Sequence, residues 1–265
     1  MIREITIGQY YNTDSIIHRL DPRTKLNAVL IYLIAVFIST SYLSYFICGL
    51  FLFLIIKLSN VPVKFIFKGL KSLIFLLLLS VVFNIFLTPG EVLFEYSFIQ
   101  VTKEGLILAS KMALRLVYLV LFSSMLTLTT TPMELTNAIE KNFGFLKIIH
   151  VPVSDIALMM SIALRFVPIL IEEVDKIMKA QMSRGARFDD KNIIKKAKSY
   201  LPLLVPIFVS AFRRANDLSF AMEARCYNNS DNRTKLNPLR YDKIDFITYV
   251  VLFIFLFLLI LIKII

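Results

Sequence analysis

The chain has 265 residues, of which 57% are hydrophobic, and its mean hydropathy is +0.72. It nevertheless carries a formal net charge of +11, with 30 Lys and Arg residues against 19 Asp and Glu residues. This combination excludes an ordinary soluble domain and is typical of a polytopic membrane protein with basic cytoplasmic segments.

The first 25 residues lack the features of an exported protein. The stretch IGQYYNTDSIIHRLDPRTK is polar and contains a proline, so it cannot supply the apolar core of a signal peptide. We therefore expect the N-terminus to remain in the cytoplasm. The two cysteines, Cys48 and Cys226, have no Cys or His neighbour at metal-ligand spacing, which argues against a disulfide framework and against a bound metal.

Five segments are candidate membrane helices, since about 20 mostly apolar residues are needed to cross a bilayer. In chain order they cover residues 26–40, 42–56, 73–87, 106–130 and 244–262. The first two are short and meet at Ser39-Thr40-Ser41, which indicates a tight helical hairpin.

The charges between these segments predict their orientation. Residues 57–71 contain four lysines and no acidic residue, whereas residues 88–105 contain three glutamates and one lysine. Because cytoplasmic loops are enriched in Lys and Arg, the lysine loop is expected inside and the acidic loop outside. Residues 131–243, which have an excess of basic residues, then lie in the cytoplasm, and the C-terminus faces outward.

Two amphipathic helices are predicted within residues 132–243. In the first, apolar side chains recur at spacings of three and four from Met159 to Met182, while charged side chains such as Arg165 and Lys176 fill the other face. In the second, an apolar stripe runs from Leu201 to Met222. We expect both helices to lie along the membrane surface or against other helices.

Local signals mark where these helices begin and bend. Thr131-Pro132-Met133-Glu134 predicts a capping box with proline at the first helical position. Ser154 or Asp155 can cap the first amphipathic helix. Prolines inside the helices are expected to divide the first into two kinked arms and to bend the start of the second: Pro168, Pro202 and Pro206.

The two amphipathic helices end alike. AQMSRG (residues 180–185) and AMEARC (221–226) share the pattern Ala-x-x-small-Arg-small. Gly185 suits the left-handed position that ends a helix, so Arg184 would lie in the last turn, where the dipole favours a cation by about 0.3–1 kcal/mol. One such arginine is commonly structural, but the repeat favours a function. An arginine on a rigid helix end can bind a carboxylate bidentately, and so could dock in an acidic groove of a partner.

Four stretches of the chain resemble the transmembrane T component of energy-coupling factor (ECF) vitamin transporters, a family that includes the CbiQ-type cobalt transporter subunits. They are GQYYNTDSIIHRLDPRTKL, LTLTTTPMELTNAIE, ALRFVPILIEEVDKIMKAQMSRGARF and PLLVPIFVSAFRRANDLSFAMEARCY. The resemblance implies that two Ala-Arg-Gly motifs end the coupling helices and dock in grooves of two ATP-binding-cassette (ABC) ATPases. By position the motifs are Ser183-Arg184-Gly185 and Ala224-Arg225-Cys226.

The chain departs from this motif at Ser183 and at Cys226, which replaces the second glycine. Because cysteine in the left-handed conformation costs roughly 1 kcal/mol or more, we expect the second helix to continue and to end at Asn228 or Asn229. Further residues are candidate supporting contacts: Arg187, Arg213, Arg214 and Glu223. The three arginines could instead bind lipid phosphate or stay solvated.

Polar residues near the membrane allow more than one interpretation. His18 lies in HRLDPR, where Asp21 could pair with Arg19 or Arg23, and a structural role is favoured over chemistry. Arg115, four residues after Lys111 in the fourth segment, could extend to the outer interface, pair with a polar residue such as Asn84, or serve transport.

Catalytic motifs are absent from the sequence. It has no G-x-x-x-x-G-K-[ST] phosphate loop, no HExxH and no G-x-S-x-G motif. We therefore expect a subunit that is not an enzyme and binds no cofactor or metal itself, with ATP and Mg²⁺ held by the partner ATPases, and no nucleic-acid binding.

Together these features predict an all-α polytopic membrane protein of the bacterial plasma membrane with about five membrane helices. It would comprise an N-terminal transmembrane domain (1–131), a cytoplasmic coupling module (132–243) and a C-terminal transmembrane helix (244–265). The resemblance implies that it transmits ATP-driven movement to a substrate-binding membrane S component. Two alternatives stay open: a T subunit dedicated to cobalt, nickel or biotin transport, and an enzyme acting on lipid at the membrane interface.

Overall fold

The computed structural model describes residues 10–96, 99–186, 188, 192–227 and 238–264. Contacts divide the chain into two compact units. One, the helical bundle, runs from Gly8 to Asn142 and includes Leu239–Ile265; the other, the crossed-helix unit, contains Phe143–Pro238. The helix that follows Thr131 belongs to the bundle, so a boundary between the two units falls after Asn142.

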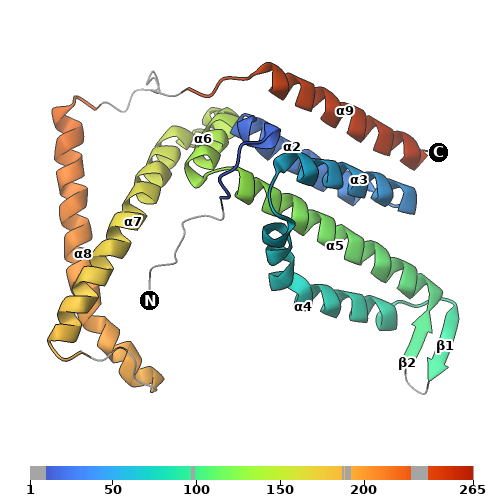
Figure 1. The fold of residues 1–265 in the computed structure, drawn as a ribbon, viewed down its shortest axis with the longest axis horizontal. Helices are drawn as coiled ribbons and strands as arrows, with labels where there is room; N and C mark the ends of the chain where they lie inside the picture. Colours follow the sequence, from blue (N-terminus) through green and yellow to red (C-terminus); the bar gives the residue numbers. More distant parts are fainter. Residues whose placement is uncertain (1–9, 97–98, 187, 189–191, 228–237, 265) are drawn as a thin grey trace. The chain divides into compact units, whose positions relative to one another are not determined.

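The helical bundle contains most of the apolar helices (Figure 1). Its elements are α1 (Ile16–Arg19), α2 (Pro22–Ile38), α3 (Tyr42–Ser59), α4 (Val63–Leu87), β1 (Val92–Tyr96), β2 (Ile99–Thr102), α5 (Lys103–Thr129), α6 (Pro132–Asn142) and α9 (Lys243–Ile264). The two strands form an antiparallel hairpin in the predicted acidic loop. All other described elements are helical, which confirms the predicted fold class.

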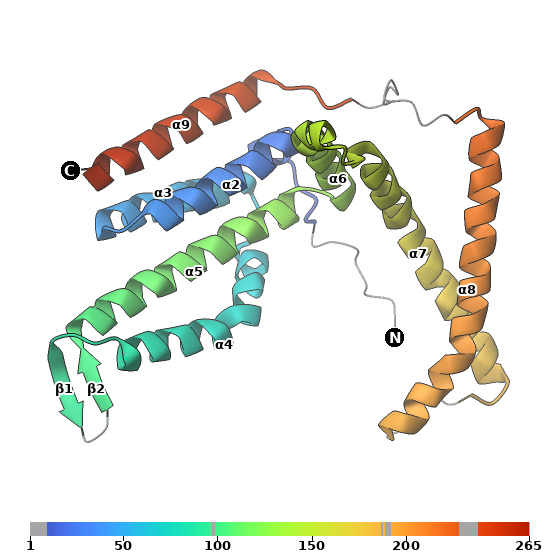
Figure 2. The same ribbon diagram turned by 180° about the vertical axis from the view of Figure 1, so that it is seen from behind.

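The crossed-helix unit contains the short 3₁₀ helix η1 (Phe143–Ile149) and two long helices, α7 (Val153–Ser183) and α8 (Ile193–Ala224). Both views of the ribbon show α7 and α8 crossing (Figures 1 and 2). α7 runs through Pro168 as one continuous helix in place of the two predicted arms, since a proline removes only one hydrogen bond of the ladder. α8 runs through Pro202 and Pro206 and is bent in its N-terminal part, as predicted.

Among the described residues, the number of candidate membrane helices agrees with the prediction, but the set differs. By length and composition, α3, α5, α7 and α9 can each cross a membrane, and α4 can if its halves, bent by 58°, form one span. α7 qualifies although its charges predicted a surface helix. α2 has 17 residues, so it is about 26 Å long and shorter than the roughly 30 Å hydrocarbon core.

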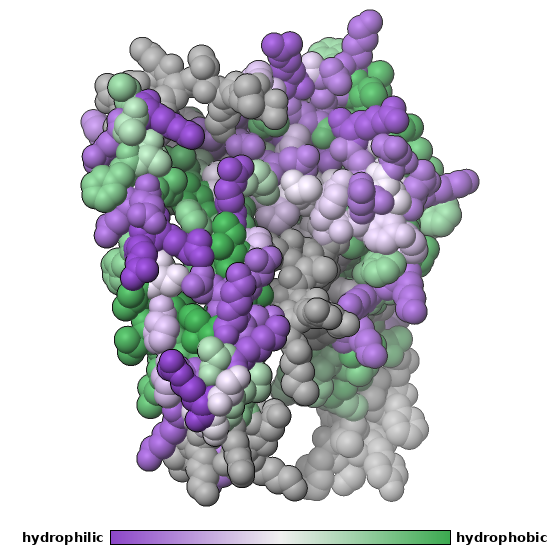
Figure 3. All heavy atoms as spheres, turned by 60° about the vertical axis from the view of Figure 1, so that its left-hand side comes forward, coloured by the Kyte–Doolittle hydropathy of each residue, from purple (hydrophilic) through white to green (hydrophobic). Residues whose placement is uncertain are grey.

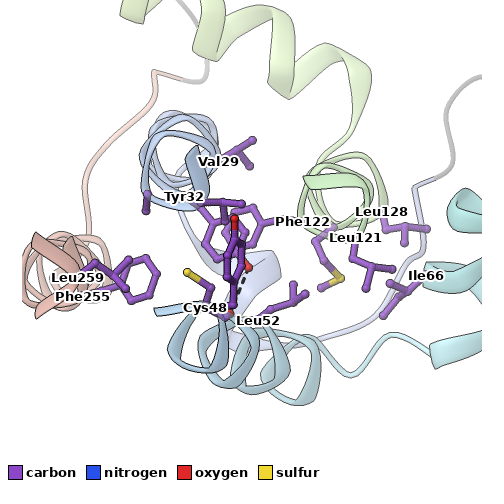
Figure 4. Packing of buried hydrophobic residues seen from close by; sticks show 14 of the residues in the cluster. Val29, Tyr32, Cys48, Leu52, Ile66, Leu121, Phe122, Leu128, Phe255 and Leu259 are labelled. Atoms are coloured by element: carbon purple, nitrogen blue, oxygen red, sulfur yellow. Dashed lines mark hydrogen bonds between the residues drawn. The ribbon is translucent and has the colours of Figure 1, made fainter. Parts of the chain in front are cut away.

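A stack of aromatic rings forms the centre of the bundle (Figure 4). Tyr32 of α2 lies against Phe122 of α5, with ring centroids 4.0 Å apart, and Phe51 of α3 lies 4.3 Å from Phe255 of α9. The buried Tyr32 hydroxyl donates to the carbonyl of Cys48 at 3.2 Å, so burial leaves it satisfied. Side chains from four helices therefore meet in one core.

Buried polar groups tie the beginning of α2 to the beginning of α9. The carboxylate of Asp245, only 1% exposed, accepts hydrogen bonds from the backbone N–H groups of Asp21 (2.9 Å) and Asp242 (2.8 Å). Asp21 in turn pairs with Arg23, one of the two predicted partners, whose guanidinium stacks on the Tyr241 ring at 3.9 Å. These contacts fix the C-terminal helix against the N-terminal part of the bundle.

Asp245→Ala is expected to destabilise the bundle by about 2–4 kcal/mol, because the buried Asp21 N–H loses its acceptor at roughly 1–3 kcal/mol and the partly buried Asp242 N–H loses its acceptor at the lower end of that range. Asp245→Asn keeps one acceptor oxygen and should cost less. Thermal unfolding of the purified full chain measures the difference. Equal melting temperatures for Asp245→Ala and the unmodified chain would mean that α9 is held by its apolar contacts alone.

Two helix starts were predicted from capping signals. The Thr131 N–H donates to Glu134 Oε2 at 3.0 Å and the Glu134 N–H donates to Thr131 Oγ1 at 3.3 Å, which confirms the capping box of α6. α7 instead begins with Pro152 at its N-cap and no side-chain cap, so the prediction of Ser154 or Asp155 was wrong. Both residues already lie in its first turn.

Candidate functional site

α7 ends in a Schellman motif that presents Arg184. The Gly185 N–H donates to the carbonyl of Met182 at 2.9 Å, and the Ala186 N–H donates to that of Gln181 at 3.0 Å. Gly185 has φ +89°, the left-handed conformation that the sequence predicted for it. Ser183 donates its hydroxyl to the Lys179 carbonyl at 3.1 Å. Arg184 is thus the C-cap residue, and its side chain is exposed.

α8 ends in the same motif, although cysteine replaces glycine. The Cys226 N–H donates to the Glu223 carbonyl and the Tyr227 N–H to the Met222 carbonyl, both at 2.9 Å. Cys226 has φ +54°. The prediction that this helix continues to Asn228 or Asn229 was therefore wrong, because two hydrogen bonds to the last turn outweigh the left-handed cost at Cys226. Asn228 and Asn229 lie outside the described residues.

The two arginines therefore occupy equivalent positions on their helices. Arg225 is the last residue before the left-handed one, as Arg184 is, and both side chains are exposed. In both ribbon views the C-terminal ends of α7 and α8 lie at opposite ends of the crossed pair (Figures 1 and 2). A pair of exposed cations is thereby held apart on two rigid helices.

An ion pair joins α7 to α8. The Arg214 guanidinium of α8 contacts the Glu173 carboxylate of α7, and neither side chain is fully exposed. Arg214 was predicted as a supporting contact for a partner, whereas the structure places it inside the crossed pair. Glu173 was missed, although it follows Leu170 by three residues and precedes Ile177 by four, so a carboxylate on the apolar stripe was the available signal.

Two of the other predicted supporting residues lie on α8, and the third is not described. Arg213 and Glu223 have exposed side chains on α8. Arg187 lies outside the described residues. Among the residues that the structure describes, no three His, Cys, Asp or Glu side chains lie together as a metal site would require.

Glycine and cysteine at the two caps predict opposite mutational effects. Gly185→Ala should destabilise the end of α7 by about 1 kcal/mol through its left-handed backbone alone, since no atom lies within 4 Å of an added Cβ. Cys226→Gly should stabilise the end of α8 by up to about 1 kcal/mol. Hydrogen exchange of peptides covering residues 181–186 and 222–227 measures both effects, and faster exchange at 222–227 in Cys226→Gly would contradict this explanation.

The intramembrane cations have partners within the bundle. Arg115 donates to the Tyr45 hydroxyl at 3.0 Å and lies over the Phe37 ring, and Lys111 lies over the Tyr42 ring. Asn84, offered as a partner for Arg115, instead donates to the Ser80 carbonyl at 2.7 Å. These contacts favour a structural role for Arg115, which lies on α5 and holds the ends of α2 and α3 near their connecting turn.

His18 also has a structural environment. Its Nδ1 lies 2.7 Å from the Ser15 hydroxyl, and its Nε2 lies 3.0 Å from the Tyr11 carbonyl. Burial lowers the pKa of His18, so the ring is neutral at neutral pH. The predicted structural interpretation fits these contacts.

The long helices of the crossed-helix unit leave many apolar side chains uncovered. Met159 of α7 is 65% exposed, and Phe208 and Phe212 of α8 are 59% and 69% exposed. In the space-filling view, hydrophobic residues reach the surface beside hydrophilic ones (Figure 3). Large exposed apolar areas on a chain mark contact with lipid or with other proteins.

Comparison with known proteins agrees with this architecture. The CbiQ family model, described as cobalt transport protein, matches residues 13–236. A relative named energy-coupling factor transporter transmembrane protein EcfT from Ruminiclostridium cellulolyticum is 49% identical over 92% of each chain. Relatives of the same name from Acidaminococcus fermentans and Bacillus subtilis are 50% and 44% identical, over 95% and 90% of this chain and 94% and 91% of their own lengths. The chain is therefore a multi-pass membrane protein that belongs to the EcfT family, the transmembrane T components of energy-coupling factor transporters.

Proposed function

We propose that this T component couples two ABC-type ATPases to a substrate-binding S component through the ends of α7 and α8. The observation that supports this most directly is the pair of equivalent Schellman caps, which present Arg184 and Arg225 at opposite ends of the crossed helices. Each arginine, with its neighbours in 183–185 and 224–226, would enter a groove on one ATPase. An exposed guanidinium at a rigid helix end suits bidentate binding of a carboxylate there.

The crossed geometry suggests how movement is transmitted. If the two ATPases approach on binding ATP and separate after hydrolysis, the two helix ends are displaced relative to each other. The Glu173–Arg214 ion pair joins the helices between their ends, so a displacement at the ends changes the angle of the crossing. The apolar faces of α7 and α8 would move with it.

These apolar faces are the proposed contact with the S component. The exposed methionine and phenylalanine side chains offer a surface with few directional bonds, on which a partner helix can slide and which several partners can share. Movement of the crossed pair would then reorient the S component in the bilayer and release its vitamin or other micronutrient inside.

In this proposal the chain has no catalytic residue or cofactor of its own, and ATP with Mg²⁺ is bound by the ATPases. The N-terminus and the crossed-helix unit face the cytoplasm, where the ATPases are, and the C-terminus faces outward. That orientation rests on the lysines of residues 57–71 and on the acidic residues of 88–105.

Affinity purification of the tagged chain from native membranes, followed by mass spectrometry, tests the proposal. We expect two ABC-type ATPases and at least one small membrane protein as S component. The identity of that protein separates a shared vitamin module from a transporter dedicated to cobalt, nickel or biotin. A chain recovered without ATPases, with turnover of lipid by the purified protein, would favour the interfacial enzyme instead.

A further inference from the structure

An apolar cavity of about 320 Å³ lies in the helical bundle between α1, α2, α3, α5 and α9. Its walls include Val29, Phe51, Met125 and Val251. The few polar groups that line it are already bonded within the chain. The Lys25 ammonium donates to the carbonyls of His18 (3.0 Å) and Thr129 (2.8 Å), and the hydroxyls of Thr129 and Thr248 donate to backbone carbonyls one turn earlier. The cavity therefore offers an occupant mainly apolar contact.

A second hollow, of about 660 Å³, adjoins the first. The two share four lining residues: Ile16, Leu54, Leu58 and Ile244. The second also has a polar rim that includes Arg19, Lys57 and Asp14. Arg19 and Lys57 have exposed side chains that form no salt bridge among the described residues. With one carboxylate against two cations, the rim has an excess of positive charge.

We propose that the joined cavities bind one anionic phospholipid, with an acyl chain in the apolar cavity and the phosphate between Arg19 and Lys57. Basic pockets between membrane helices bind anionic headgroups, and a cavity without free polar groups suits hydrocarbon. A partner helix with an apolar face would leave the positive charge of the rim unpaired, whereas a phosphate complements it. The proposal requires only that the bundle lies in a membrane, and is independent of ATPase docking.

The test uses the full chain in vesicles of equal parts phosphatidylglycerol and phosphatidylcholine, re-extracted in mild detergent for native mass spectrometry. The unmodified chain should retain phosphatidylglycerol in preference to phosphatidylcholine. The double variant Arg19→Gln/Lys57→Gln should retain roughly tenfold less phosphatidylglycerol, because each cation near a lipid surface contributes to anion binding. The matched control Lys64→Gln/Lys68→Gln removes two exposed lysines of α4 that do not line the cavities and should retain as much as the unmodified chain.

A second pair of variants tests the apolar half of the site. Ala28→Trp and Val251→Trp fill the cavity from α2 and from α9, and either one that remains monodisperse should lose both lipids while keeping the basic rim. The proposal would be overturned if the unmodified chain retained the two lipids equally. It would also be overturned if the control Lys64→Gln/Lys68→Gln lost as much phosphatidylglycerol as Arg19→Gln/Lys57→Gln. Displacement of the lipid by millimolar inorganic phosphate would also overturn it, since the site would then bind an anion without an acyl chain.

Discussion

Arg184→Glu is expected to prevent stable binding of one ATPase to this T component and to abolish ATP-driven uptake. The Arg184 side chain is exposed at a helix end and has no salt-bridge partner among the described residues, so the change costs the isolated chain little. Buried arginine anchors in interfaces contribute about 2 kcal/mol or more, and a lost anchor weakens binding by at least roughly thirtyfold. A carboxylate facing an acidic groove adds repulsion. Co-purification of the ATPases and uptake in reconstituted vesicles measure both effects.

Arg225→Glu is expected to have the same effect at the other end of the crossed pair. Each single variant should co-purify with about one ATPase in place of two, and the double variant with none. Arg165→Glu reverses an exposed charge on α7 about 28 Å from Arg184 and is the matched control. If both single variants retain two ATPases and full uptake, neither helix end is an anchor. If Arg165→Glu loses ATPases equally, the net charge of the helices is responsible.

Structural features that depend on contacts within one helical turn could be predicted from the sequence more reliably than features that depend on contacts between distant segments. The amphipathic helices and the capping box of α6 follow from contacts within one turn, and sequence spacing reports these directly. The end of α8 was mispredicted because residue preference alone was considered at Cys226. The hydrogen bonds of Tyr227 and Cys226 to the preceding turn are possible for any residue that reaches the left-handed conformation, and they decide where the helix ends.

Contacts between segments that are distant in the chain could not be predicted from the sequence. The bond from Arg115 to Tyr45 joins α5 to α3, and the bond from the Asp21 N–H to Asp245 joins residues 224 positions apart. The β1–β2 hairpin was read as an acidic loop, because short strands depend on their pairing partner more than on local pattern. The equivalent positions of Arg184 and Arg225 at two helix ends were nevertheless predicted, since their signal was a repeat within the sequence itself.

Phe208→Asp/Phe212→Asp is expected to separate binding of the S component from binding of the ATPases. Both side chains are more than half exposed on α8, and a phenylalanine buried in an interface contributes about 1.5–3 kcal/mol. Loss of the two should weaken association with the S component by at least about a hundredfold. Phe212 lies 13 residues before Arg225, about 20 Å along the helix, so the docking end keeps its geometry.

The variant should therefore co-purify with two ATPases and without the S component, and ATP hydrolysis should continue without uptake. Asn216→Asp introduces a charge on the polar side of the same helix and should leave all three partners bound. Retention of the S component and of uptake by the phenylalanine variant would show that these faces contact lipid alone. If the arginine variants lose ATPases and the phenylalanine variant loses the S component, the ends of the crossed helices bind the ATPases and their apolar faces bind the S component. Coupling then requires that α7 and α8 each move as a rigid body between the ATPases and the S component. The ion pair of Glu173 with Arg214, which joins the two helices, would support such movement.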